Sequence, residues 1–225
     1  MVELKINYIK NKSDFFKTLE NSESFKIKNI QNYIPLYEKF FILNETNWNS
    51  INLNQQRSIV NCYERKNFNI FNCKLIDKNT NEEIIKNIFV KFSPLLDPIK
   101  YLVGKYDHNH KELFDLPKIN DSYCHEKIKN VYNSAYTDSF FSYLTSKLLN
   151  EFEFSHGLDF FGSYLGNLED YRVNIYDDLE YIVESSFFNK NKDELFRVDN
   201  EYYNLVSESD SRDRKKRLKL GEEIH

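Results

Sequence analysis

The sequence predicts an α+β fold in which an antiparallel sheet of about four or five strands packs against one amphipathic helix. Three observations favour this class. Residues 69–92 are rich in β-branched and aromatic residues on both sides of a polar cluster, and residues 133–152 repeat apolar residues at helical spacing. In addition, 40% of the 225 residues are hydrophobic and 16% are aromatic, which is enough to build a sizeable core.

The stretch from 69 to 92 is predicted to be a β-hairpin. An apolar run at 70–76 precedes the polar cluster DKNTNEE at 77–83, and the run IIKNIFVKF at 84–92 follows it. Two strand-forming runs joined by turn-forming residues are typical of antiparallel neighbours.

The segment 133–152 is the clearest helix in the sequence. Its apolar residues include a row at every fourth position, which places them near one face of a helix. The row is Tyr136, Phe140, Leu144 and Leu148. A short helix is also predicted from Pro98, because proline suits the first helical position and Gly104 can end the helix.

Composition suggests three parts of the chain. We expect residues 1–57 to form an N-terminal helical or mixed extension, residues 58–206 an α+β domain, and residues 207–225 a charged flexible tail. The tail carries the basic run RDRKKRLK at 212–219, but acidic residues on both sides offset its charge. Because the net charge is −4, a nucleic-acid partner is not expected.

The cysteines and the apolar runs of the sequence indicate the compartment. The N-terminus lacks the apolar core of a signal peptide, and no run approaches the roughly 20 apolar residues of a membrane span. The three cysteines, Cys62, Cys73 and Cys124, form no Cys-x-x-Cys pair. We therefore expect an intracellular chain with reduced cysteines and no membrane partner.

Lys91 is the leading candidate for a ligand-binding residue. It lies in the strand-like run IFVKFS at 88–93, and the next strong helix carries Asp138. In phosphotransferases a strand lysine contacts the nucleotide phosphates, and a carboxylate on the following helix holds that lysine. A polar residue on the solvated face of an ordinary strand is the competing interpretation.

Three stretches of the chain resemble protein-kinase-like proteins of giant and other large cytoplasmic DNA viruses. They are IFVKFSPLLDPIKYLVGKY, NSAYTDSFFSYLTSKLL and FSHGLDFFGSYLG. The resemblance covers residues from about 60 to 190 and implies a kinase-type small lobe that binds ATP and magnesium. It implies that Lys91 orients the phosphates and that Asp138 holds Lys91. It also implies a viral protein of the host cytoplasm or the virion.

The chain departs from the kinase pattern in ways that bear on catalysis. No glycine precedes Gly104, so the glycine-rich loop over the phosphates is missing, and no HRD or DFG motif occurs. We therefore assign no catalytic residue. If the protein is a serine/threonine kinase-like phosphotransferase, the large lobe must come from further chain or from a protein partner. The alternative is a pseudokinase, a non-catalytic interaction or virion protein on a degenerate kinase-like scaffold.

Two further groups of polar residues are candidates for a metal site and for the edge of a cleft. The first could supply zinc ligands, but the chain has no Cys-x-x-Cys pair to complete the site, so we predict no metal site. It consists of His108, His110, Cys124 and His125. The second is His156 with Asp159, beside glycines that favour turns, and these two residues could line the edge of a cleft.

Overall fold

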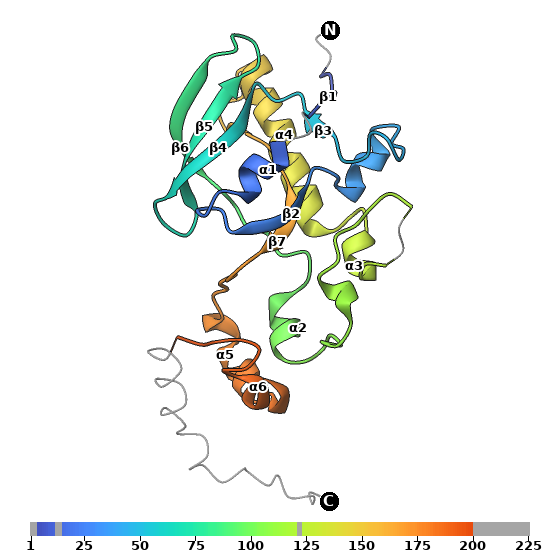
Figure 1. Cartoon of the computed structure of the whole chain (residues 1–225), viewed down its shortest axis with the longest axis vertical. Coiled ribbons are helices and arrows are strands. Elements are labelled where there is room, and N and C mark those ends of the chain that lie inside the picture. Colours follow the sequence, from blue (N-terminus) through green and yellow to red (C-terminus); the bar gives the residue numbers. More distant parts are fainter. Residues whose placement is uncertain (1–3, 12–14, 121–122, 200–225) are drawn as a thin grey trace, which may run out of the picture. The chain divides into compact units, whose positions relative to one another are not determined.

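The structure is a computed structural model, and it describes residues 4–11, 15–120 and 123–199 (Figure 1). The chain divides into two compact units. The first comprises residues 1–96 and 109–172, and the second comprises residues 97–108 and 173–225. No boundary falls at residue 57, and the expected tail at 207–225 lies outside the described residues.

The α+β class is confirmed, but the strands of the first unit divide among three antiparallel sheets instead of forming one. The largest has the order β4-β5-β6, and the two others pair β1 with β3 and β2 with β7. The strands are β1 (Tyr8–Lys10), β2 (Ile27–Gln31), β3 (Ile51–Leu53), β4 (Arg57–Arg65), β5 (Ile70–Asp77), β6 (Glu83–Phe89) and β7 (Leu165–Leu168).

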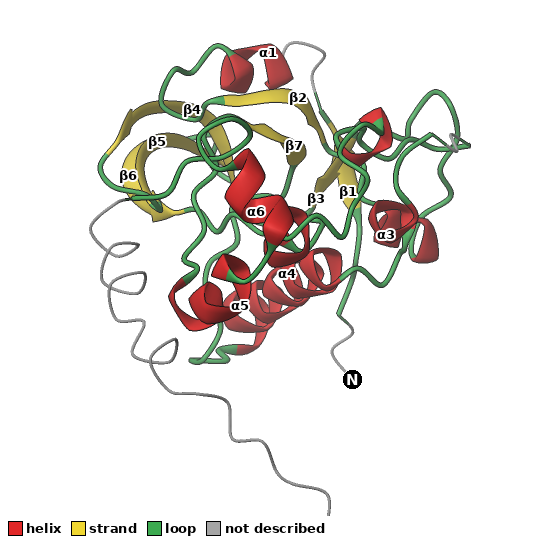
Figure 2. Ribbon diagram, turned by 90° about the horizontal axis from the view of Figure 1, so that it is seen from below, coloured by secondary structure: helices red, strands yellow, loops and turns green. Residues whose placement is uncertain are grey.

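Helix α4 is the one long helix among the described residues. In Figure 2 the strands of the first unit (yellow) lie to one side of it. The helices are α1 (Phe15–Glu20), α2 (Pro98–Leu102), α3 (Glu126–Lys129), α4 (Ser134–Phe152), α5 (Leu179–Val183) and α6 (Ser186–Asn191). Short 3-10 helices cover Pro35–Lys39, Lys111–Leu113 and Tyr176–Asp178. No helix in these ranges is both long enough and apolar enough to span a membrane.

The predicted hairpin is confirmed as β5 and β6. The two strands pair without a register shift from Ile70 opposite Phe89 to Ile76 opposite Glu83. Alternate residues of β5 are buried, as expected for a sheet with one face on a core. By contrast, β4 is irregular, because its pairing with β5 shifts at two points.

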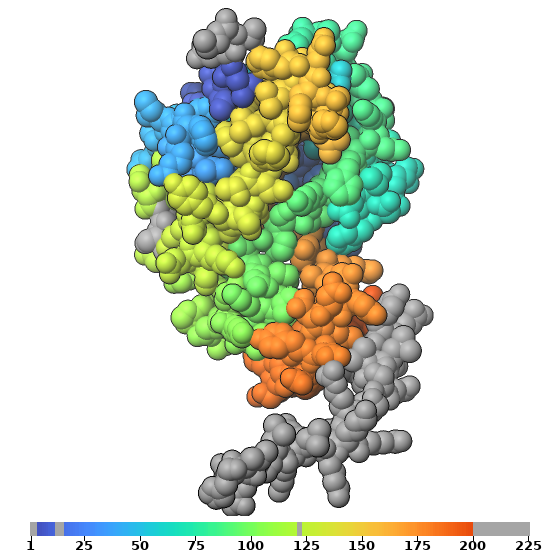
Figure 3. All heavy atoms as spheres, turned by 180° about the vertical axis from the view of Figure 1, so that it is seen from behind, coloured from blue at the N-terminus to red at the C-terminus, as the bar shows by residue number. Residues whose placement is uncertain are grey.

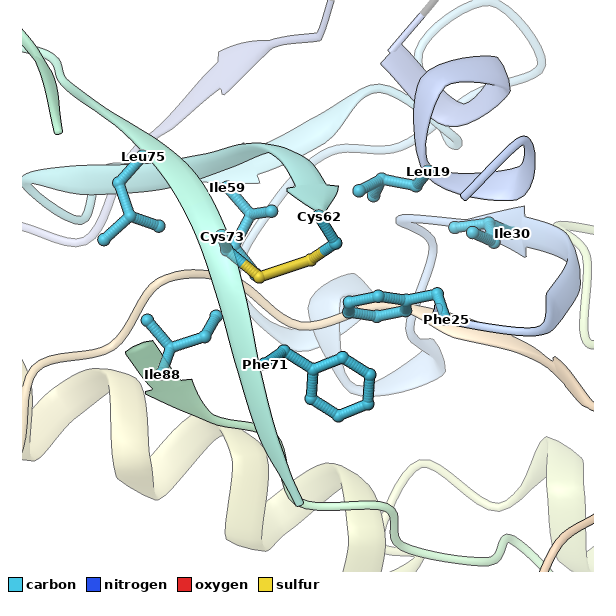
Figure 4. Packing of buried hydrophobic residues seen from close by; sticks show 9 residues of the cluster. All are labelled: Leu19, Phe25, Ile30, Ile59, Cys62, Phe71, Cys73, Leu75 and Ile88. Atoms are coloured by element: carbon cyan, nitrogen blue, oxygen red, sulfur yellow. A yellow bond between two sulfur atoms is a disulfide. The ribbon is translucent and has the colours of Figure 1, made fainter. Parts of the chain in front are cut away.

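A first hydrophobic cluster covers the buried face of this sheet (Figure 4). The ring of Phe71 on β5 meets the ring of Phe25, with centroids 4.9 Å apart. Leu19 and Ile30 also belong to this cluster. Residues before 57 therefore build the core of the first unit and do not form a separate extension.

Cys62 on β4 and Cys73 on β5 form a disulfide inside this cluster (Figure 4). The expectation of reduced cysteines is wrong for this pair. The two residues are 11 positions apart in sequence, but they lie directly opposite each other in the two strands, with Cα atoms 4.2 Å apart. Strand pairing brings the two sulfurs together, and no cysteine motif records it.

Helix α4 carries a second cluster through a stripe that differs from the predicted row. Tyr136 and Phe140 are buried as expected, but the stripe continues through Tyr143 and Lys147, while Leu144 and Leu148 are half-buried. With 3.6 residues per turn, each step of four residues drifts about 40° around the helix. Steps of three and four must alternate to keep side chains on one face.

The second unit is built around Leu102, Ile182 and Phe188, which come from α2, α5 and α6. Asp97 caps α2 by accepting a hydrogen bond from the Ile99 N–H, and Gly104 follows the helix with a positive φ of 76°. The predicted short helix that ends at Gly104 is therefore confirmed.

Candidate functional site

The structure brings Lys91 and Asp138 together. The Lys91 Nζ donates a hydrogen bond to the Asp138 Oδ2 over 2.7 Å, and the pair joins residues 47 positions apart. Lys91 lies two residues beyond the end of β6, and Asp138 lies in the second turn of α4. The sequence predicted that Lys91 lies inside the strand. In the structure it lies in the segment that follows the strand.

Hydrogen bonds on both sides of Lys91 fix the position of this segment. The Val90 N–H donates to the Asn69 carbonyl over 2.7 Å, which extends the β5–β6 ladder by one step toward Lys91. Four residues after Lys91, the Leu95 carbonyl accepts a hydrogen bond from the Asn133 Nδ2 over 2.9 Å. Asn133 also caps α4. One residue thus ties the segment to the start of the helix that carries Asp138.

The N-terminal turn of α4 is anchored on its other side as well. The Tyr136 hydroxyl donates to the Ile128 carbonyl over 2.8 Å, and the Asn133 Nδ2 also donates to the Lys127 carbonyl. Burial raises the pKa of Tyr136, so this hydroxyl stays protonated. The backbone on which Asp138 stands is therefore held from two directions.

The pair itself is exposed to solvent. The Lys91 side chain is 61% exposed and that of Asp138 is 47% exposed. From behind, the surface of α4 (yellow) borders the green segment that follows β6 (Figure 3). An ion pair with this exposure contributes only about 0–1 kcal/mol to stability. The Lys91 ammonium is accessible to a ligand, but it does not lie inside a closed cleft.

Asp159 belongs to a network of charged and polar groups. Its carboxylate lies 3.7 Å from the Arg57 Nη1 and accepts a hydrogen bond from the Asn150 Nδ2. The Nε of the same arginine lies 3.3 Å from the Asp77 Oδ2. Arg57 therefore connects the start of β4 to the loop after α4. The other predicted cleft residue, His156, meets the ring of Phe154 edge-on.

Two ionisable residues of the β5–β6 turn were missed by the sequence reasoning. Asp77 is buried, and its carboxylate accepts a hydrogen bond from the Asn79 N–H. This bond holds the pKa of Asp77 below its usual range. Lys78 is half-buried and donates to the Leu53 carbonyl over 2.8 Å, and burial lowers its pKa to about 8. An aspartate at the start of a polar turn indicates that its side chain accepts hydrogen bonds from the turn backbone. Nothing local in the sequence indicates the burial of Lys78.

Two histidines of the zinc hypothesis, His108 and His125, have structural roles. His125 caps α3, because its Nδ1 accepts a hydrogen bond from the Lys127 N–H. In the second unit, His108 lies against the rings of Tyr101 and Phe187. Within the described ranges, no group of three or more His, Cys, Asp or Glu side chains could hold a metal ion.

The first unit also has an open hollow of about 330 Å³ between α1, β2 and β7. Its charged side chains have both signs, and Lys28 and Glu169 form an ion pair there. A hollow of mixed charge does not favour one charged ligand, and neither Lys91 nor Asp138 lines it.

Comparison of the chain with protein-family models, with curated proteins and with solved structures found no match. A function for this chain must therefore be argued from its own residues, and we argue it from the Lys91–Asp138 pair.

Proposed function

We propose that this chain is a kinase-like small lobe of a large DNA virus protein and that it binds ATP with magnesium through Lys91. Asp138 would hold the Lys91 side chain in position. The observation that supports this is the 2.7 Å contact between the Lys91 Nζ and the Asp138 Oδ2. The order of a sheet, a lysine and then a helix carboxylate is that of the kinase small lobe.

The chemistry of the pair suits a phosphate ligand. A lysine ammonium has three N–H donors, and Asp138 accepts from one of them. The remaining donors can bind phosphate oxygens, and hydrogen bonds between charged groups are the strong ones. Because the Lys91 side chain is exposed, a nucleotide would meet it without unfolding any buried contact.

Phosphoryl transfer is a further step in the proposal. We assign no catalytic residue in this chain, so transfer from ATP to serine or threonine would need a large lobe from further chain or from a protein partner. Location in the host cytoplasm or in the virion belongs to the same proposal, because it follows from the same viral resemblance.

A second candidate function is a non-catalytic interaction or virion protein on this scaffold. It is favoured by the lack of any glycine before Gly104 and by the exposure of the Lys91–Asp138 pair. Without a glycine-rich loop, the phosphates lose the row of backbone N–H donors that kinases provide.

The test is thermal unfolding with and without Mg-ATP. Binding to the folded chain should raise its stability, by about 2.7 kcal/mol at a hundredfold excess over the dissociation constant. We expect the melting temperature of the wild type to rise, and the rise to disappear in Lys91→Ala and to shrink in Asp138→Asn. The matched control is Lys28→Ala, which breaks an ion pair of similar exposure elsewhere in the first unit.

The outcomes separate the two candidates. No shift at millimolar Mg-ATP would contradict nucleotide binding by this chain and favour the interaction protein. A shift that persists in Lys91→Ala would place the nucleotide away from Lys91. A shift lost equally in Lys28→Ala would show a general charge effect.

A further inference from the structure

Strand β6 is one of the two edge strands of the β4-β5-β6 sheet (Figure 1). Among the described residues it is hydrogen-bonded to β5 alone. Its opposite edge therefore presents unpaired backbone N–H and C=O groups, which are a template for another strand.

The hydrogen-bond pattern shows which residues face that free edge. The Asp77 N–H donates to the Glu82 carbonyl, and the Val90 N–H donates to the Asn69 carbonyl, so even-numbered residues of β6 bond to β5. In an antiparallel ladder the alternate residues point the other way. The residues whose backbone groups point outward are Glu83, Ile85, Asn87 and Phe89.

The side chains along this edge are unusually apolar for an exposed strand. Ile85 is 63% exposed and Phe89 is 65% exposed, and Ile88 alone in β6 is buried. Edge strands are ordinarily protected by charges, prolines or a covering element. Between residues 84 and 89, only Lys86 and Asn87 interrupt the apolar residues, and Lys86 is the one charged residue.

We propose that β6 pairs antiparallel with β6 of a second copy of this chain, with Asn87 on the two-fold axis. The two three-stranded sheets would then join into one continuous sheet. The partner is a second copy because this strand complements itself in one register. The proposal goes beyond nucleotide binding and does not depend on it.

On the exposed face of β6, the register with Asn87 on the axis pairs apolar with apolar side chains and amide with amide. Ile85 lies opposite Phe89 of the second copy, and this contact occurs twice by symmetry. Both side chains lie on the sheet face that also carries Asn72, whose Nδ2 donates to the Asn87 Oδ1 over 3.0 Å. The two Asn87 side chains would continue that bond into a ladder of amides. Cross-strand apolar and amide pairs of this kind stabilise sheets.

The neighbouring registers are poorer. Moving the axis to Lys86 places two lysines directly opposite each other, and like charges in that position are destabilising. Moving it to Ile85 pairs the two Ile85 side chains but leaves Phe89 opposite Asn81, which lies outside the strand. The register centred on Asn87 avoids both of these conflicts.

The first measurement is the mass in solution of the wild type over a dilution series. We expect twice the chain mass of 27.1 kDa, falling toward the monomer on dilution. Ile85→Lys and Ile85→Pro should both yield monomers, because one adds a repelling charge and the other removes an outward-facing N–H that β5 does not use. Ile42→Lys, at an exposed isoleucine away from β6, is the matched control and should leave the dimer intact.

The second measurement tests the register through cysteine cross-linking in a Cys124→Ala background. Asn87→Cys should form an intermolecular disulfide under mild oxidation, because the Cα atoms of a hydrogen-bonded pair lie about 5.5 Å apart. Lys86→Cys should cross-link less, since it lies off the axis. A monomeric wild type, a dimer that survives both Ile85 variants, or stronger linkage through Lys86→Cys would each overturn the proposal.

Discussion

Lys78 shows how the fold changes the chemistry of one residue. It lies in the turn between β5 and β6, half-buried, with its ammonium donating to the Leu53 carbonyl. Burial disfavours the charged form, and it lowers the pKa of Lys78 to about 8 from an ordinary value of 10.5. The consequence is a pH dependence of stability that one side chain should control.

Between pH 8 and 10.5 the unfolded chain holds the Lys78 proton while the folded chain releases it. Stability therefore rises with pH across this window, through the contribution of this residue. We expect the free energy of unfolding of Lys78→Met, measured in urea on both sides of the window, to lack that rise. The exposed substitution Lys118→Met, away from β6, is the control. Equal pH slopes in Lys78→Met and the wild type would contradict the assignment.

At this scale the sequence predicted one pair and missed another. Lys91 and Asp138 were predictable because Lys91 directly follows the clear pattern of β6 and Asp138 lies on α4, in the order that kinases use for their strand lysine and helix carboxylate. The environments of Asp77 and Lys78 depend on how the turn packs against the segment near Leu53. That packing comes from distant parts of the chain, so local composition could not indicate it.

At the scale of elements, α4 offers a direct test of burial. Phe140 is 6% exposed and stacks on Phe40, whereas its neighbour Phe141 is 65% exposed. Truncation of a buried phenylalanine removes packing contacts and leaves a cavity.

We expect Phe140→Ala to lower the free energy of unfolding by about 3–5 kcal/mol. Phe141→Ala makes the same chemical change one position along the helix and should cost only about 0.5 kcal/mol or less. Urea unfolding of the two variants measures the difference. Similar losses in both would mean that the second cluster does not pack against Phe140 as described.

Element length explains why the sequence predicted α4 and the β5–β6 hairpin but not the four shortest strands. Helix α4 and the β5–β6 hairpin are long enough for their periodicity to stand out. The strands β1, β2, β3 and β7 have three to five residues each, too few for alternation to be recognised. The sequence therefore predicted one sheet, whereas the structure has three.

At the scale of the whole molecule, the Cys62–Cys73 disulfide crosslinks two strands at the centre of the first cluster. In the chain-entropy account, a crosslink stabilises by restricting the unfolded chain, and a loop of 11 residues gives about 3 kcal/mol.

We expect a reducing agent to lower the melting temperature of the wild type. Cys62→Ala/Cys73→Ala should start from a lower value and should not respond to the reducing agent. If reduction leaves the wild type unchanged, or if the double variant also responds, the disulfide is not the source of the effect.

The division into two units was not predictable from composition. Residues 97–108 leave the first unit, join residues beyond 172, and the chain then returns at 109. This arrangement depends on which distant apolar segments find each other. Leu102 packs with Ile182 and Phe188, about eighty residues later in the sequence, and no change in composition marks either boundary.

The antiparallel pairing of β2 with β7 also has a consequence during synthesis. The contact beside it, between Lys26 and Asp170, joins residues 144 positions apart. At about 5–20 residues per second, a ribosome needs roughly 7 to 30 s to synthesise the residues between them. During this interval β2 has no partner strand, so its backbone N–H and C=O groups stay unpaired in the nascent chain, and a chaperone could hold this segment until β7 emerges.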